Sequence, residues 1–131
     1  MEILHASSDS SGALLLTFTG EVKTEADVEQ LKRDIETVSR SIRSFHESQG
    51  RRIKVLVNIT NFQAEFMLQA LEAMINLAKA DKNLVERTAI FGASQSIKAM
   101  GDIIVIISRR DNIKFFATKA EALTWLFSVS H

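Results

Sequence analysis

The chain has 131 residues, of which 46% are hydrophobic and 24% are charged. This length and balance indicate one globular domain, residues 1–131, and exclude a disordered or collagen-like chain. The 16 basic residues equal the 16 acidic residues in number, so the basic excess typical of a nucleic-acid binder is absent. There is no cysteine, which excludes disulfides, thiol catalysis and cysteine-ligated metal centres.

The first third of the chain predicts two strands and a long helix. Residues 3–4 and 14–18 are short apolar runs, and the Ser-, Asp- and Gly-rich stretch 7–12 between them has the chemistry of a turn. Thr24 suits a helix N-cap, and apolar residues then recur every three or four positions until Gly50. The predicted helix therefore has roughly 24 residues and a length of about 36 Å.

The rest of the chain alternates strands with helices. The predicted strands are residues 53–59, 88–92 and 113–116, and the predicted helices are residues 66–79, one capped by Ser94 and one capped by Thr118. Residues 60–65 are expected to form a loop. The run 103–107 has the β-branched composition of a strand, but the alternating order favours a helix there.

The predicted order is thus β-β-α-β-α-β-α-β-α, which is typical of an α/β fold. Alternating units of this kind imply one mixed, mostly parallel sheet packed with helices and joined by right-handed crossovers. Residues 53–59 are almost continuously apolar, so we expect this strand to be covered on both faces.

Three segments of the sequence resemble those of a known family. Residues 55–62 look like its third strand and the following loop, residues 86–92 like its fourth strand, and residues 112–126 like its closing strand and helix. The family is that of the STAS fold, named for sulfate transporters and anti-sigma-factor antagonists, with particular likeness to the small bacterial proteins grouped as STAS/SEC14-like. The resemblance implies a regulatory or protein-interaction module. The SEC14 likeness implies, as the alternative, a small carrier for a lipid or another apolar ligand.

The resemblance also implies a partner-binding surface after the third strand. The residues that mark this surface are Phe62, Glu65, Phe66 and Gln69. The alternative is that both Phe side chains fold into the core. Regulatory members of the family are phosphorylated on a Ser or Thr of an Asp-Ser-Ser-Gly-like site here, but residues 65–69 contain no hydroxyl. An Asp-Ser-Ser-Gly tetrapeptide does occur at residues 9–12, and we interpret it as a turn.

No set of residues predicts catalysis, a metal or a cofactor. The histidines, His5, His46 and His131, lack metal-ligand spacing. Residues 92–96 superficially resemble the nucleophile elbow of hydrolases, but Ser96 stands where a glycine is needed. We therefore interpret Ser94 as an N-cap. The free backbone N–H groups of this helix start make Ser94 and Ser96 candidates for binding an anion.

The long helix predicts a second copy of the chain as a partner. Strands of five to seven residues cover only about 17–24 Å, so a helix of about 36 Å would overhang the sheet. Ile42 and Phe45 lie on that overhang, and Val105 and Ile106 lie on a helix that is apolar on all sides. We predict that these four residues contact a partner subunit in a homodimer, with the alternative that Val105 or Ile106 lines a lipid-sized groove. The alternative is that a loop or the second helix covers the overhang.

The sequence therefore predicts a non-enzymatic module of STAS-like fold with an unknown protein partner. No apolar run is long enough to span a bilayer, and the first residues do not form a signal peptide, so we expect a cytoplasmic protein. The alternative function is that of a carrier with a lipid or another apolar small molecule as its ligand.

Overall fold

The computed structural model describes residues 2–65 and 68–128. In chain order the elements are β1 (Leu4–Ser8), β2 (Leu14–Val22), α1 (Glu25–Gln49), β3 (Ile53–Ala64), α2 (Leu68–Ala80), β4 (Val85–Phe91), α3 (Gln95–Ser108), β5 (Ile113–Phe116) and α4 (Lys119–Leu126). The predicted order of strands and helices is confirmed, including the helix over residues 103–107.

The strands form one sheet in the order β1-β2-β3-β4-β5. β1 and β2 pair antiparallel, and all the other neighbouring strands pair parallel. The predicted turn joins β1 to β2, and within it the Ser11 backbone N–H donates to Asp9 Oδ2 at 3.0 Å. The predicted α/β fold with a mixed, mostly parallel sheet is therefore confirmed.

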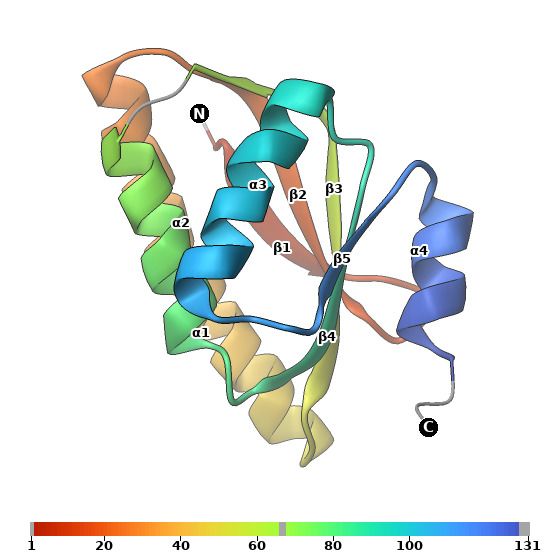
Figure 1. Ribbon diagram of the computed structural model, residues 1–131. Helices are drawn as coiled ribbons and strands as arrows, with labels where there is room; N and C mark the ends of the chain where they lie inside the picture. The colour runs from red at the N-terminus through yellow and green to blue at the C-terminus, as the bar shows by residue number, and fades with distance from the viewer. Residues whose placement is uncertain (1, 66–67, 129–131) are drawn as a thin grey trace.

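The helices cover the sheet unequally (Figure 1). α1, α2 and α3 lie over one face, and the short α4 lies over the other. The side chains of β3 alternate between these layers, because successive residues of a strand point to opposite faces. Val55 and Val57 join the core beneath α1, whereas Leu56 joins the smaller core beneath α4. β3 is thus covered on both faces, as its apolar sequence predicts.

The expected loop over residues 60–65 is wrong. β3 continues to Ala64, and its last four residues pair with the end of β2 in a register that runs from Thr19↔Asn61 to Val22↔Ala64. An irregularity in the pairing between Thr17 and Thr19 precedes this extension. The polar residues of the extension look like a loop in the sequence, but they are the exposed positions of a strand that lies beyond the end of β4.

The overhang predicted for the long helix is covered by α2, which was the alternative to a partner subunit. α1 runs antiparallel to β3, so its last turns lie near the start of that strand and away from the extension (Figure 1). At this end, Ile42 lines the same cavity as Leu77 of α2, and Arg43 acts on Asp81, which follows α2. Ile42 is only 3% exposed and belongs to the main core, and Phe45 packs against the same core. The prediction that Ile42 and Phe45 need a partner subunit to cover them is therefore wrong, because the chain covers both residues itself.

A buried acid fixes the first strand to α1. Asp34 is 6% exposed, and its Oδ2 accepts hydrogen bonds from the backbone N–H groups of Ile3 at 2.7 Å and Leu4 at 3.1 Å. Its other oxygen accepts from Gln30 Nε2 at 2.8 Å. Both oxygens of this carboxyl are therefore satisfied, which makes its burial tolerable.

Among the helices described, none is long and apolar enough to cross a membrane.

Candidate ligand-binding cavity

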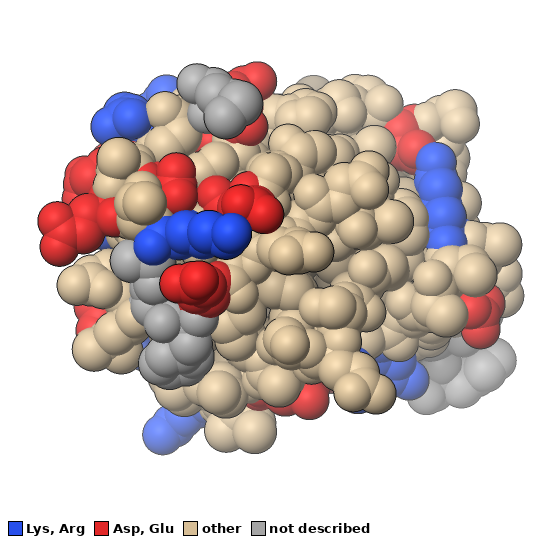
Figure 2. Space-filling model, turned by 90° about the horizontal axis from the view of Figure 1, so that it is seen from above, with Lys and Arg blue, Asp and Glu red and all other residues tan. Residues whose placement is uncertain are grey.

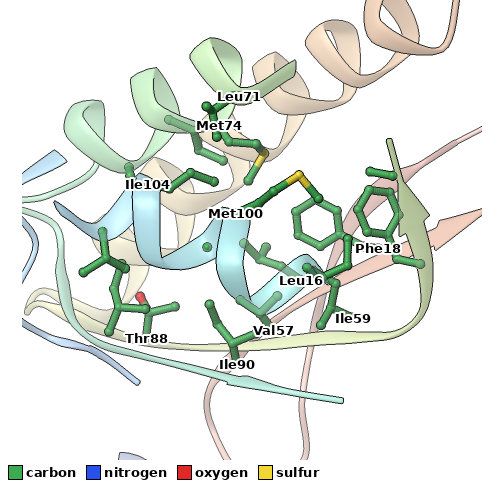
Figure 3. A pocket seen from close by; sticks show the side chains of 18 of the residues that line it. Leu16, Phe18, Val57, Ile59, Leu71, Met74, Thr88, Ile90, Met100 and Ile104 are labelled. Carbon is green, nitrogen blue, oxygen red and sulfur yellow. The ribbon is translucent and has the colours of Figure 1, made fainter. Parts of the chain in front are cut away.

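An apolar cavity of about 180 Å³ lies between the sheet and the helix pair α2 and α3. Strands β2 to β5 form its floor, α2 and α3 form its roof, and Leu31 and Ile42 of α1 also line it. Figure 3 shows Leu16, Val57 and Ile90 on the strand side, opposite Met74 and Met100 on the helices. The helices therefore cover this face without filling all the space between themselves and the strands.

The sequence periods place these side chains in the cavity. Every second residue of a strand points to the same face, which brings Leu16 and Phe18 of β2 to the cavity side. On the helices, steps of three and four residues form one apolar stripe, and Met100 and Ile104 of α3 follow it. The same patterns that predict a core therefore also produce the cavity walls.

A glycine in the middle of α3 sets part of the cavity's shape. A Cβ atom at Gly101 would clash with the ring of Phe115 on β5. Both residues line the cavity. The glycine thus allows the Phe115 ring to approach the helix backbone, although glycine inside a helix costs about 1 kcal/mol relative to alanine.

We infer that one end of the cavity reaches the protein surface beside Glu65, the exposed residue among the described residues that line it. Just inside Glu65, the rings of Phe18 and Phe62 pack with centroids 5.2 Å apart. Figure 2 shows the molecule from this end, with acidic side chains gathered over the start of α1 and an uncharged area in the middle. We call this the open end of the cavity.

The opposite end is closed by two charged side chains. Asp81, which follows α2, is 3% exposed, and Arg110, which follows α3, is 6% exposed. Both line the cavity together with Thr88 of β4, and Figure 3 places Thr88 at the far side of the cavity from Phe18. We call this the closed end.

Arg110 is held in place by three hydrogen bonds. Its Nε donates to Asn112 Oδ1 at 2.7 Å, its Nη1 to the Ala78 carbonyl oxygen at 3.2 Å and its Nη2 to Thr88 Oγ1 at 3.2 Å. Burial lowers the pKa of Arg110, an effect that the nearby Asp81 opposes. Because the guanidinium is bonded to α2, β4 and the start of β5, it cannot swing out of the closed end.

Asp81 is less well satisfied than Arg110. Among the described residues, its Oδ2 is buried without a hydrogen-bond partner. Burial raises the pKa of the Asp81 carboxyl, and the charges of Arg43 and Arg110 and a hydrogen bond with the Ser39 side chain only partly oppose this effect. A buried polar atom without a partner is uncommon in a folded protein, so the closed end contains an unused hydrogen-bonding position.

The predicted partner-binding residues do not form one exposed surface. Phe62 is 9% exposed and belongs to the core, so its assignment to a partner surface is wrong. Glu65 lies at the open end of the cavity, and Gln69 lies beside the first turns of α1 in a shallow depression. Phe66 falls outside the described residues.

The predicted helix cap at Ser94 is confirmed. Ser94 Oγ accepts a hydrogen bond from the Ile97 backbone N–H at 3.3 Å. Ser96 is exposed, and binding of an anion by these two residues stays a prediction. His5 lies on β1 and His46 on α1, while His131 falls outside the described residues. Within residues 2–65 and 68–128, no three His, Asp or Glu side chains gather as a metal site requires.

The two predicted contact residues on α3 point in different directions. Ile106 is 74% exposed, whereas Val105 is half-buried and lines the cavity. Of the two roles predicted for Val105, its position agrees with an apolar groove and not with an outward-facing subunit contact. Ile103 and Ile107 lie with Ile106 on the outer side of α3, 37% and 48% exposed. Formation of a homodimer stays a prediction.

Asp81 and Arg110 are the residues that the sequence does not single out. Asp81 stands in a polar stretch that breaks the helical pattern, and Arg110 suits a helix carboxyl end. Their burial depends on α2 and α3 ending beside β4, and no local pattern encodes that arrangement. Their position at a helix end is the only sequence feature that marks these two residues, and many exposed residues of other proteins share that feature.

Comparisons with known proteins agree with this architecture. The model of the SpoIIAA-like family matches residues 14–127. A solved structure of an uncharacterized protein of the DUF3478 family, with a SpoIIAA-like fold, from Shewanella loihica PV-4 superimposes with a TM-score of 0.59. The two chains are 22% identical, and the match covers 94% of this chain and 91% of the other. The search of curated proteins found no match. The predicted resemblance to STAS-like proteins is therefore confirmed at the level of family and fold.

Proposed function

The chain belongs to the SpoIIAA-like family, and we propose that this member is a non-enzymatic carrier that holds a small apolar molecule in its cavity. The observation that supports the proposal is the cavity of about 180 Å³ with walls of Leu, Ile, Val, Met and Phe side chains. Protein interiors are normally close-packed. An empty space of this size would cost roughly 4 kcal/mol at about 24 cal/mol per Å³, a large part of a typical stability of about 5–15 kcal/mol.

The size of the cavity limits the ligand. An engineered apolar cavity of about 150 Å³ binds benzene, so this cavity has room for a ring or a short alkyl chain. Transfer of each CH₂ group from water into such a site contributes about 0.8 kcal/mol. Because the open end lies at the surface beside Glu65, a longer ligand can extend out of the protein.

The arrangement of polar groups supports binding and not catalysis. Ser94 uses its hydroxyl to cap α3, and among the described residues no hydrogen bond joins it to a histidine. The hydroxyl of the closed end, Thr88 Oγ1, accepts a hydrogen bond from Arg110. Among the described residues, no hydrogen bond joins Thr88 Oγ1 to a carboxylate or an imidazole that would activate it as a nucleophile.

Binding of naphthalene tests the proposal. Methyl NMR signals of the cavity residues Ile90 and Ile104 should shift on titration, with a single dissociation constant. Ala70→Leu places three extra carbon atoms in the cavity wall and should weaken binding about tenfold or more. Ala80→Leu makes the same change at an exposed position of α2 and should bind as the wild type does. Equal binding by both variants, or no binding by the wild type, would refute the proposal.

A second candidate function is protein interaction through the outer side of α3. Ile103, Ile106 and Ile107 form an exposed apolar surface there, and such surfaces commonly contact other proteins. We expect light scattering to give the mass of a dimer for the wild type and of a monomer for Ile106→Glu. Ala99→Glu, at an exposed position of the same helix, is the control. A monomeric wild type at high concentration would exclude self-association by this surface.

A further inference from the structure

The apolar walls of the cavity do not explain the charged groups at its closed end. The three hydrogen bonds of Arg110 use three of the five N–H groups that a guanidinium carries. The remaining two are available to an acceptor. Asp81 Oδ2 is buried and has no partner among the described residues, and no ion pair joins Asp81 to Arg110 directly. Donors and an acceptor therefore remain unused on two neighbouring cavity residues.

The charges at the two ends of the cavity differ in sign. At the closed end, Arg43, Arg52 and Arg110 act on the site together with Asp81 and Asp111, which leaves a formal excess of one positive charge among these groups. At the open end, the exposed Glu65 carries a negative charge. An anionic group is therefore favoured at the closed end and disfavoured at the open end.

We propose that the ligand is a monocarboxylic acid with an alkyl tail, and that its carboxyl group lies at the closed end between Arg110 and Asp81. This inference rests on the proposed carrier function and names the chemical class of the ligand. The tail lies along Ile90, Val57 and Leu16 and points toward the Phe18–Phe62 pair and the open end.

The carboxyl group matches both unused positions. One of its oxygens accepts charge-assisted hydrogen bonds from the two remaining N–H groups of Arg110, one on each Nη atom. The other shares one proton with Asp81 Oδ2, as two neighbouring carboxyl groups do when both cannot ionise. Burial raises the pKa of Asp81, which favours the presence of that proton. An ester or an alkane cannot make both contacts.

A ligand series on the wild-type protein tests the inference without any substitution. Octanoic acid, methyl octanoate and 1-octanol have similar tails and differ in the head group. We expect calorimetry at neutral pH to show that octanoic acid binds about tenfold or more tightly than methyl octanoate, because hydrogen bonds to charged groups are lost in the ester. Octanol, which can donate and accept but is uncharged, should fall between them. An ester that binds as tightly as the acid overturns the inference.

Two variants locate the head group. Arg110→Gln should weaken octanoate about tenfold or more and should weaken naphthalene, which has no head group, by a much smaller factor. Asp81→Asn should bind octanoate more tightly than the wild type, because the amide N–H donates to the carboxylate and the negative charge is removed. Asp102→Asn makes the same change at an exposed position of α3 and should have no effect. Unchanged or weaker octanoate binding by Asp81→Asn refutes the placement. If Arg110→Gln does not fold, the ligand series and the Asp81→Asn variant still test whether the carboxyl group lies at the closed end.

The failure of this inference differs from the failure of the carrier function. If neither naphthalene nor any octyl compound binds, both proposals are wrong. If naphthalene and methyl octanoate bind as tightly as octanoic acid, the cavity is a carrier site but its ligand is not recognised by a carboxyl group.

Discussion

The two faces of the sheet are packed in opposite ways. Beneath α4, the side chains of Ala13, Leu56, Ala89, Ala122 and Leu126 are completely buried, and the alanines allow an eight-residue helix to lie close to the strands. On the other face, three longer helices cover the sheet and leave about 180 Å³ between α2, α3 and the strands. The cavity thus occurs on the face that has more helix and more large apolar side chains.

The α4 face shows that this chain is able to pack tightly. Trp125 of α4 lies against the Phe116 ring, with centroids 5.6 Å apart, and the Arg87 guanidinium lies 4.9 Å from the Trp125 ring centroid. Offset aromatic contacts and cation–π contacts of this kind each contribute about 0.5–1 kcal/mol. The cavity on the opposite face is therefore a local property of the α2 and α3 layer, as the proposed carrier function requires.

Removal of a large side chain should separate the two faces most clearly. Leu56→Ala should destabilise the protein by about 3–4 kcal/mol, since a fully buried leucine leaves a new cavity behind. Met74→Ala should cost about 1–2 kcal/mol, because Met74 already borders empty space and loses fewer contacts. Urea unfolding at equal m values measures both. Equal losses would contradict the difference in packing.

Addition of a side chain should have opposite effects on the two faces. Ala122→Leu should destabilise the protein by about 1–3 kcal/mol, because the α4 core has no space for it. Ala70→Leu should be neutral or should stabilise the protein by up to about 1 kcal/mol, since its side chain enters the cavity. Thermal unfolding of both variants measures the effect. A loss for Ala70→Leu as large as that for Ala122→Leu would mean that the cavity is absent in solution.

The acids of the two faces should respond to pH in opposite directions. On the cavity face, burial raises the pKa of Asp81 above the ordinary value of 3.8, so the folded protein holds this proton more tightly than the unfolded chain does. The wild type therefore loses stability relative to Asp81→Asn as the pH rises from 3.8 to the folded pKa. Above that pKa the difference is constant. Urea unfolding across this pH range measures the difference in free energy of unfolding between the wild type and Asp81→Asn. A difference that shrinks with rising pH would contradict the prediction.

On the α4 face, Asp9 of the first turn pairs with Lys119 at the start of α4, at 2.9 Å. Hydrogen bonds from Ser11 and the ion pair with Lys119 lower the pKa of Asp9 to about 2. Its stabilising effect is complete above 3.8 and is lost as the pH falls toward 2. Asp9→Asn should remove no more than about 1 kcal/mol near neutral pH, because water screens a surface pair. A wild type and a variant with equal unfolding midpoints at neutral pH would show that the pair contributes nothing.

Local sequence patterns predict most of the fold and little of the candidate site. The helical stripe of α1, with its cap at Thr24, extends to Gly50 as expected. The end of β3 is missed, because Asn61 and Gln63 are polar residues on exposed strand positions and look like a loop. The cavity is missed for another reason. Period and propensity place Met74 and Ile90 on facing surfaces, but the distance between those surfaces is set by the whole layer.

The residue at position 101 affects the volume of the cavity. The Phe115 ring occupies the place that a side chain at position 101 would take. A methyl group there would displace the ring, and because both residues line the cavity, the displaced ring can occupy part of its volume. Alanine or serine at the corresponding position of a related sequence should therefore accompany a smaller chamber or a smaller residue opposite it. Under the proposed carrier function, the residues at these two positions would indicate the size of ligand that fits a homologue before its structure is determined.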